Sequence, residues 1–207
     1  NNDGYEFGIH WLDNDGNVEL VIAGDWLPIM VLSYNNTGKF DNKTHQFGLD
    51  KTNGMWNVIK ISDINNDGKL DIIAGNTGLN FKWKASVEKP VKMYLDDFDK
   101  NGQLDQLIFY DYFGTYVPFA SKDKLVQQIP SLKKKFLNYN TFSKVESVFD
   151  LTQKQEADIL ETKYIYELRS MIYVNNGTKF TPQPLPKQAQ FSTIEDMLID
   201  NNQIIFT

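Results

Sequence analysis

The chain has 207 residues, with 21 lysines and arginines against 27 aspartates and glutamates, so its formal net charge is −6. This negative balance argues against a nucleic-acid-binding protein, which would normally present a basic surface. The absence of cysteine excludes disulfides, thiolate nucleophiles and cysteine-based zinc or iron–sulfur sites. The sequence contains no apolar run near the roughly 18 residues of a membrane span, so none is expected.

Short apolar segments rich in β-branched and aromatic residues predict strands, because each has strand length and is bounded by Gly, Asn, Asp or Pro. These segments are Val18–Ala23, Ile29–Tyr34, Trp56–Ile61, Leu70–Ala74, Val91–Leu95 and Leu104–Tyr110. Consecutive short strands separated by turn residues predict an all-β fold, which could be a sandwich, a barrel or a propeller.

Two repeated elements favour the propeller. The first is an aspartate-rich loop leading into an apolar strand, at Asp13–Gly16, Asp63–Gly68 and Asp97–Gly102. The second is a strand followed by an asparagine-rich turn and a Lys-Phe pair, at Val31–Phe40 and Met171–Phe180. Two alternating hairpin types make one four-stranded unit, and radial repetition of such units gives β-propeller blades.

Residues 121–161 depart from this pattern and predict a helical insertion within one blade, between blades at 1–120 and their return at 162–207. The apolar residues of this segment recur at helical spacing, as Leu125, Ile129, Leu132 and Phe136. Pro130 separates two short helices, and Thr152 with Gln155 forms a capping-box pattern before a third. Such an insertion can be a packing element or can take part in binding, and the sequence leaves both open.

Two of the aspartate-rich loops have the spacing of a calcium site. Each has oxygen-bearing side chains at relative positions 1, 3, 5 and 9, and glycine at position 6. Calcium prefers six to eight oxygen ligands, and a backbone carbonyl at position 7 would add another. The predicted ligands are Asp63, Asn65, Asp67, Lys69 and Asp71 in one loop, and Asp97, Asp99, Asn101, Gln103 and Asp105 in the other, with Lys69 and Gln103 contributing carbonyls.

The alternative is an acidic turn without an ion, because Asp, Asn and Gly favour turns anyway. Identical spacing in two loops favours calcium, and about two ions are expected on this motif. The loops differ from an EF-hand, since position 12 has no glutamate and the flanking segments are strands. A third loop has Trp11 at position 1, with Asp13, Asp15 and Glu19 at positions 3, 5 and 9, so weak binding or none is expected there. Ile199–Ile205 is predicted to be a plain hairpin.

The two complete loops, with the following Ile72-Ile73-Ala74-Gly75, resemble the FG-GAP/VCBS repeats of integrin-α-like β-propellers. Gly24–Ile29, Ser121–Leu125 and Ile129–Phe136 give a closer resemblance to bacterial VCBS-repeat proteins that often carry an ASPIC/UnbV-type domain. The resemblance implies a propeller, calcium, and an extracellular, periplasmic or outer-membrane-associated setting. It does not imply a reaction.

The length of the chain is short for a closed ring. Without the insertion about 165 residues remain, enough for three to four blades of about 40 to 50 residues. A propeller has four to eight blades, so we expect a longer propeller chain or a second copy to complete it.

Two functions are open on the sequence. The first is a non-catalytic module for binding or scaffolding, with a protein or carbohydrate ligand at the cell surface. The second is a propeller-type polysaccharide-active enzyme, similar to a lyase. His10 and His45 lack metal-type spacing, no Gly-x-Ser-x-Gly, P-loop or His-Glu-x-x-His motif occurs, and no catalytic residue is assigned. Tyr110, Tyr112, Tyr116 and Arg169, the only arginine, could line a carbohydrate groove, although aromatic residues more commonly pack between blades.

Overall fold

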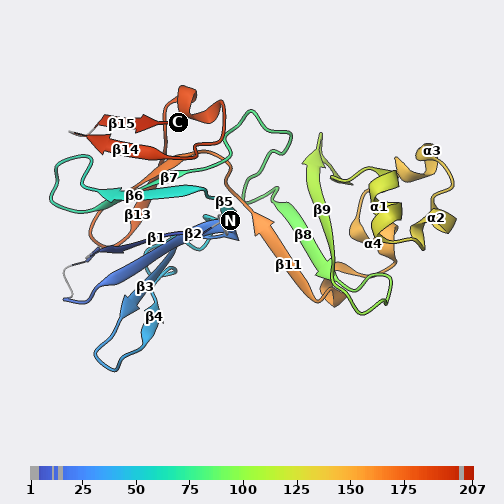
Figure 1. Cartoon of the computed structure of the whole chain (residues 1–207), viewed down its shortest axis with the longest axis horizontal. Helices are drawn as coiled ribbons and strands as arrows, with labels where there is room; N and C mark the ends of the chain where they lie inside the picture. The colour runs from blue at the N-terminus through green and yellow to red at the C-terminus, as the bar shows by residue number, and fades with distance from the viewer. Residues whose placement is uncertain (1–4, 11, 14–15, 201–202) are drawn as a thin grey trace. The chain divides into compact units, whose positions relative to one another are not determined.

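The computed structural model describes residues 5–10, 12–13, 16–200 and 203–207. For residues 5–7, 9 and 10 it describes the backbone alone. The chain is mostly β and forms several antiparallel sheets (Figure 1). It divides into two compact units, one made of Asn1–Lys82 and Ile165–Thr207, the other of Trp83–Tyr164. Each unit is described by itself.

The first sheet of the larger unit is an up-and-down sheet whose four main strands follow chain order. These strands are β1 (Tyr5–His10), β2 (Glu19–Leu27), β3 (Met30–Tyr34) and β4 (Phe40–Asn42), and the short β5 (Gly54–Met55) pairs with the end of β2. Val21 and Ala23 on β2 have no exposed surface, because alternate side chains of this strand face the core.

The second sheet of this unit is interrupted in sequence. Its order is β13-β12-β7-β6, built from β6 (Val58–Ser62), β7 (Asp71–Gly75), β12 (Met171–Asn175) and β13 (Phe180–Pro184). The whole smaller unit is inserted between β7 and β12. The Asn76 N–H donates to Ser170 Oγ at 3.0 Å, which joins the two parts of the sheet across a sequence separation of 94 residues.

The remaining elements of this unit follow β13. They are a 3₁₀ helix, η2 (Lys187–Gln190), and the hairpin of β14 (Met197–Asp200) and β15 (Gln203–Phe206). The hairpin lies where one was predicted, and its tip, Asn201 and Asn202, falls outside the described residues.

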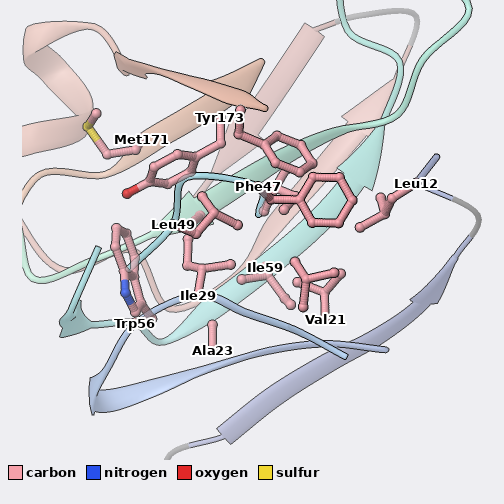
Figure 2. Packing of buried hydrophobic residues seen from close by; sticks show 14 residues of the cluster. Leu12, Val21, Ala23, Ile29, Phe47, Leu49, Trp56, Ile59, Met171 and Tyr173 are labelled. Atoms are coloured by element: carbon pink, nitrogen blue, oxygen red, sulfur yellow. The ribbon is translucent and has the colours of Figure 1, made fainter. Parts of the chain in front are cut away.

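A shared hydrophobic core joins the first and second sheets of the larger unit (Figure 2). Trp56 and Tyr173 pack edge to face, with ring centroids 6.1 Å apart, and Val21 of the first sheet belongs to the same cluster. The Trp56 Nε1–H donates to Thr52 O at 2.9 Å, so this buried indole keeps its hydrogen bond.

The smaller unit has its own four-stranded sheet, in the order β10-β9-β8-β11. Its strands are β8 (Val91–Asp96), β9 (Asp105–Tyr112), β10 (Thr115–Pro118) and β11 (Glu161–Ile165). Short helices follow β10, namely α1 (Lys122–Gln128), α2 (Leu132–Lys135), α3 (Tyr139–Phe142), α4 (Val148–Thr152) and the 3₁₀ turn η1 (Glu156–Asp158).

The helical segment, defined as residues 121–160, covers one face of this sheet. Tyr94, Leu107 and Phe109 project from that face into a cluster that includes the buried apolar residues of the predicted helical stripe, Leu125, Ile129, Leu132 and Phe136. No helix among the described residues is long and apolar enough to cross a membrane.

The predicted capping box is wrong. Thr152 is the last residue of α4, and its hydroxyl donates to Val148 O at 2.8 Å instead of starting a helix. The capping interaction lies at the other end of α4, where Ser147 Oγ accepts from the Asp150 N–H at 3.1 Å. The Asp150 carboxylate accepts the Ser147 hydroxyl at 2.8 Å, and this bond lowers the pKa of Asp150.

Candidate metal centre

The two complete aspartate-rich loops, here the 63–71 loop and the 97–105 loop, have the same backbone conformation. Both connect neighbouring antiparallel strands, β6 to β7 and β8 to β9. Both take left-handed φ angles at positions 4 and 6. These angles are 60° at Asn66, 83° at Gly68, 61° at Lys100 and 84° at Gly102.

The carboxylate at position 1 organises each loop. In the 63–71 loop, Asp63 Oδ1 accepts from the Asp67 N–H at 3.1 Å and Asp63 Oδ2 accepts from the Gly68 N–H at 2.8 Å. The equivalent bonds of the 97–105 loop, from positions 5 and 6, measure 2.9 and 2.8 Å. The oxygen-bearing side chains are therefore held at the loop by its own backbone.

The carboxylate at position 9 closes each loop. Asp71 Oδ2 accepts from the Ile64 N–H at 3.1 Å, and Asp105 Oδ2 accepts from the Phe98 N–H at 3.2 Å. Both aspartates are buried at the start of a strand. Burial is the main reason why the pKa of Asp71 is raised, and the nearby negative charges of Asp67 and Asp63 raise it further. A bound cation would offset both effects.

The 97–105 loop brings its carboxylates closest together. Ligand atoms of Asp97, Asp99 and Asp105 lie within 4.8 Å of one another, and this is the one such acidic group among the described residues. In the 63–71 loop, Asp67 Oδ2 lies 3.3 Å from Lys69 Nζ, so an ammonium group already neutralises part of its charge.

The described part of the third loop shares two features with the complete loops. The Leu12 N–H donates to Glu19 Oε2 at 2.8 Å, as position 2 does to position 9 in the complete loops. Gly16, at position 6, has a φ of 85°. The predicted positions 1 and 5, Trp11 and Asp15, lie outside the described residues.

Residues 12–74 match the FG-GAP-like repeat. The matched FG-GAP-like repeat contains the 63–71 loop and most of the third loop, and ends before the 97–105 loop. Searches of the curated proteins and of the solved structures found no match.

The donor sets of the 63–71 loop and of the 97–105 loop fit calcium. Carboxylate, amide and backbone carbonyl oxygens are the ligands that this hard cation takes, and neither loop contains a nitrogen or sulfur ligand suited to zinc. Asp63, Asn65, Asp67 and Asp71, with the Lys69 carbonyl, would hold one ion. Asp97, Asp99, Asn101 and Asp105, with the Gln103 carbonyl, would hold the other.

The other residues singled out in the sequence belong to different parts of the described structure. The His45 side chain is 93% exposed and pairs with Asp50 at 2.9 Å, whereas the His10 side chain falls outside the described part. Tyr110 and Tyr112 are neighbours on β9, with ring centroids 6.3 Å apart. The Tyr116 hydroxyl donates to Pro90 O at 2.9 Å. These tyrosines belong to the smaller unit.

Arg169 belongs to the larger unit and borders a pocket of about 440 Å³ that sequence reasoning did not find. The residues that line it are Leu79, Asn80, Arg169, Pro184, Lys187, Gln190 and Phe191. The Arg169 guanidinium donates to both carboxylate oxygens of Glu167, at 2.8 and 2.6 Å. In the sequence, only the single arginine drew attention to this region. The pocket is formed by segments that are distant in sequence, so it could not be predicted.

Proposed function

We propose that this chain is a calcium-binding β-repeat module that binds or scaffolds and does not catalyse. The observation that carries the proposal is the pair of loops with the same spacing, the same left-handed positions and the same internal hydrogen bonds. A turn without an ion would not need three carboxylates in each copy, because these charges repel one another.

Calcium would act by stabilising the folded state. An ion that binds the folded chain alone adds about 2.7 kcal/mol at a concentration one hundred times its dissociation constant. In each loop the ion would join the end of one strand to the start of the next. This role suits a fold without cysteine, in which no disulfide restrains the hairpins.

We further propose that the sheets are blades of a propeller related to the VCBS-type repeats. The first two sheets of the larger unit each have four antiparallel main strands, and the β14–β15 hairpin would begin a third blade. Another part of a longer chain or a second copy would complete the ring. An extracellular, periplasmic or outer-membrane-associated setting, with a protein or carbohydrate ligand, belongs to this proposal.

The bidentate pairing of Arg169 with Glu167 favours binding over lyase chemistry. A lyase of the type considered needs a cation to neutralise the substrate carboxylate. In this chain an internal carboxylate already balances the charge of Arg169. The pocket beside it offers apolar contacts from Leu79, Pro184 and Phe191, and thus a place for a ligand.

Calorimetric calcium titration of the whole chain tests the proposal. The wild type should bind about two ions, and the paired variants Asp63→Asn with Asp71→Asn, and Asp97→Asn with Asp105→Asn, should each lose one. Asp158→Asn is the matched control, because it neutralises an exposed aspartate outside the loops. No calcium heat, together with a melting temperature that EDTA leaves unchanged, would refute calcium binding.

A further inference from the structure

The helical segment contacts the 97–105 loop directly. The Gln128 side chain, at the end of α1, donates from Nε2 to Asp105 Oδ1 at 3.1 Å. Asp105 lies two residues before Leu107 on β9, so both side chains face the helix-covered side of the sheet. The carboxylate that closes the loop is therefore also a contact of the helical segment.

Two further contacts join the same partners. Phe98, at position 2 of the loop, packs against the apolar cluster of the helical segment. Asp96 is the cross-strand neighbour of Asp105, and its carboxylate accepts from the Leu160 N–H at 3.0 Å and from the Lys154 ammonium group. Both ends of the loop are thus attached to residues from the helical segment.

The other two loops lack this arrangement. The position-9 carboxylate of the 63–71 loop accepts from the backbone N–H of Asn175 on β12, at 2.8 Å. The equivalent Glu19 accepts from the Ser33 hydroxyl on β3, at 2.9 Å. In both cases the partner is the next strand of the same sheet. In the 97–105 loop the partner is instead a side chain at the end of a helix.

We propose that Gln128 is a positioning residue for a calcium ion in the 97–105 loop, and that ion binding and packing of the helical segment are coupled through it. This inference rests on the calcium binding proposed above. A carboxylate has about four lone-pair sites, so Asp105 can accept from Gln128 and Phe98 and still ligate a cation. Gln128 would hold the carboxylate in its ligating orientation, as outer-shell hydrogen bonds do at metal sites.

Coupling of this kind works in both directions. If docked helices favour calcium binding, bound calcium must favour docked helices by the same factor. Calcium binding in the 97–105 loop would then stabilise the packing of the helical segment. The 63–71 loop, closed by a strand of its own sheet, would only stabilise that sheet.

The test uses the full chain with the 63–71 loop disabled by Asp63→Asn and Asp71→Asn, so that one site is titrated. In this background, Gln128→Met keeps the length of the side chain and removes the donor. We expect calcium to bind about fivefold more weakly, the usual effect of losing one partly exposed hydrogen bond. Gln127→Met, at the exposed neighbouring position, is the matched control and should bind like the background.

Two readouts separate positioning from a structural role. In EDTA, Gln128→Met should melt only slightly below Gln127→Met, because the Nε2 group also loses its bonds to Asp105 Oδ1 and Gln106 O without calcium, and the calcium-dependent rise should be smaller for Gln128→Met. Calcium should also slow hydrogen exchange of the α1 amides in the background chain, and much less in Gln128→Met.

The possible failures are distinguishable. Equal calcium affinities for Gln128→Met and its control would overturn the coupling and leave calcium binding intact. Destabilisation by Gln128→Met in EDTA, with an unchanged affinity, would assign the residue a structural role only. Absence of calcium binding in the background chain would overturn both this inference and the proposed site in the 97–105 loop.

Discussion

Replacing Gly78 by alanine should test the close backbone approach beside the pocket that Arg169 borders. Gly78 has a φ of +83°, and a Cβ placed there would lie 2.8 Å from Gln190 O and 3.0 Å from Ser192 O. These are backbone oxygens, so they cannot move aside as the end of a long side chain can. Gly68 provides the matched comparison, because its φ is also +83° and a Cβ there meets nothing within 4 Å.

The two substitutions share one cost and differ in another. Alanine in a left-handed conformation costs about 1 to 2 kcal/mol at either position. At Gly78, relief of the overlap needs a backbone shift, and overpacking of this kind adds about 1 to 3 kcal/mol. The shift would also weaken two short bonds, from the Gly78 N–H to Leu168 O and from the Leu79 N–H to Gln190 O, both 2.8 Å long.

Urea unfolding in EDTA, followed by tryptophan fluorescence, measures the difference. EDTA is needed because Gly68 lies within a proposed calcium loop. We expect Gly68→Ala to lower the free energy of unfolding by about 1 to 2 kcal/mol, and Gly78→Ala by about 2 to 5 kcal/mol. Equal losses for the two variants would refute the claim that close backbone approach at Gly78 adds to the cost of the substitution.

Further predictions concern charge, turn strain and capping. Asp71→Asn should lower the melting temperature in EDTA, because both carboxylate oxygens accept backbone N–H groups, from Ile64 and Asn175, and an amide NH2 group cannot accept in place of one of them. It should also reduce the rise on adding calcium; an unchanged melting temperature in EDTA would show that removal of the buried charge offsets the lost acceptor. Phe113→Asn should raise the free energy of unfolding by about 1 kcal/mol, because Phe113 is 92% exposed at a φ of 51° in a two-residue turn. A decrease in urea unfolding would show that the contact of its ring with Tyr112, with centroids 4.8 Å apart, matters more. Ser147→Ala should cost about 1 kcal/mol through loss of the cap. The pKa of Asp150 in the folded state is lowered, so the ionised carboxylate stabilises the fold above its ordinary pKa of 3.8, and this stabilisation is lost as the pH falls through the lowered pKa. The cost of Ser147→Ala should therefore be smaller near pH 3 than at pH 6 in urea titrations.

Local features of this chain were predictable because local chemistry decides them. Val91–Leu95 was predicted as a strand and β8 spans Val91–Asp96, since a short, mostly buried segment bounded by turn residues favours a strand. The sharp turn of each complete loop followed from the glycine at position 6, which has a left-handed φ angle in both, whereas the left-handed φ angle of Lys100 at position 4 is not indicated by its residue type. The capping box failed because Thr152 with Gln155 and Ser147 with Asp150 both satisfy the pattern, and only tertiary packing decides which one starts a helix.

Non-local features were not predictable from the sequence. The sequence does not indicate that β12 pairs with β7, because the strands lie on either side of the smaller unit and any antiparallel edge would satisfy their backbones. The same limit applies to the candidate site. The ligand spacing can be read from the sequences of the loops, whereas the contact of Gln128 with Asp105 depends on where α1 packs.

The interruption of the second sheet also predicts an order of folding. The β8–β9 and β9–β10 hairpins of the smaller unit are local, so they should form early. The pairing of β12 with β7 must close a far longer loop, and until then β7 presents an unpaired edge whose side chains are all buried in the native sheet. Such an edge can pair with another chain, so aggregation during synthesis should compete mainly with this late step. Lower expression temperature, or prior folding of the inserted unit, should therefore raise the soluble yield more than stabilisation of the first sheet does.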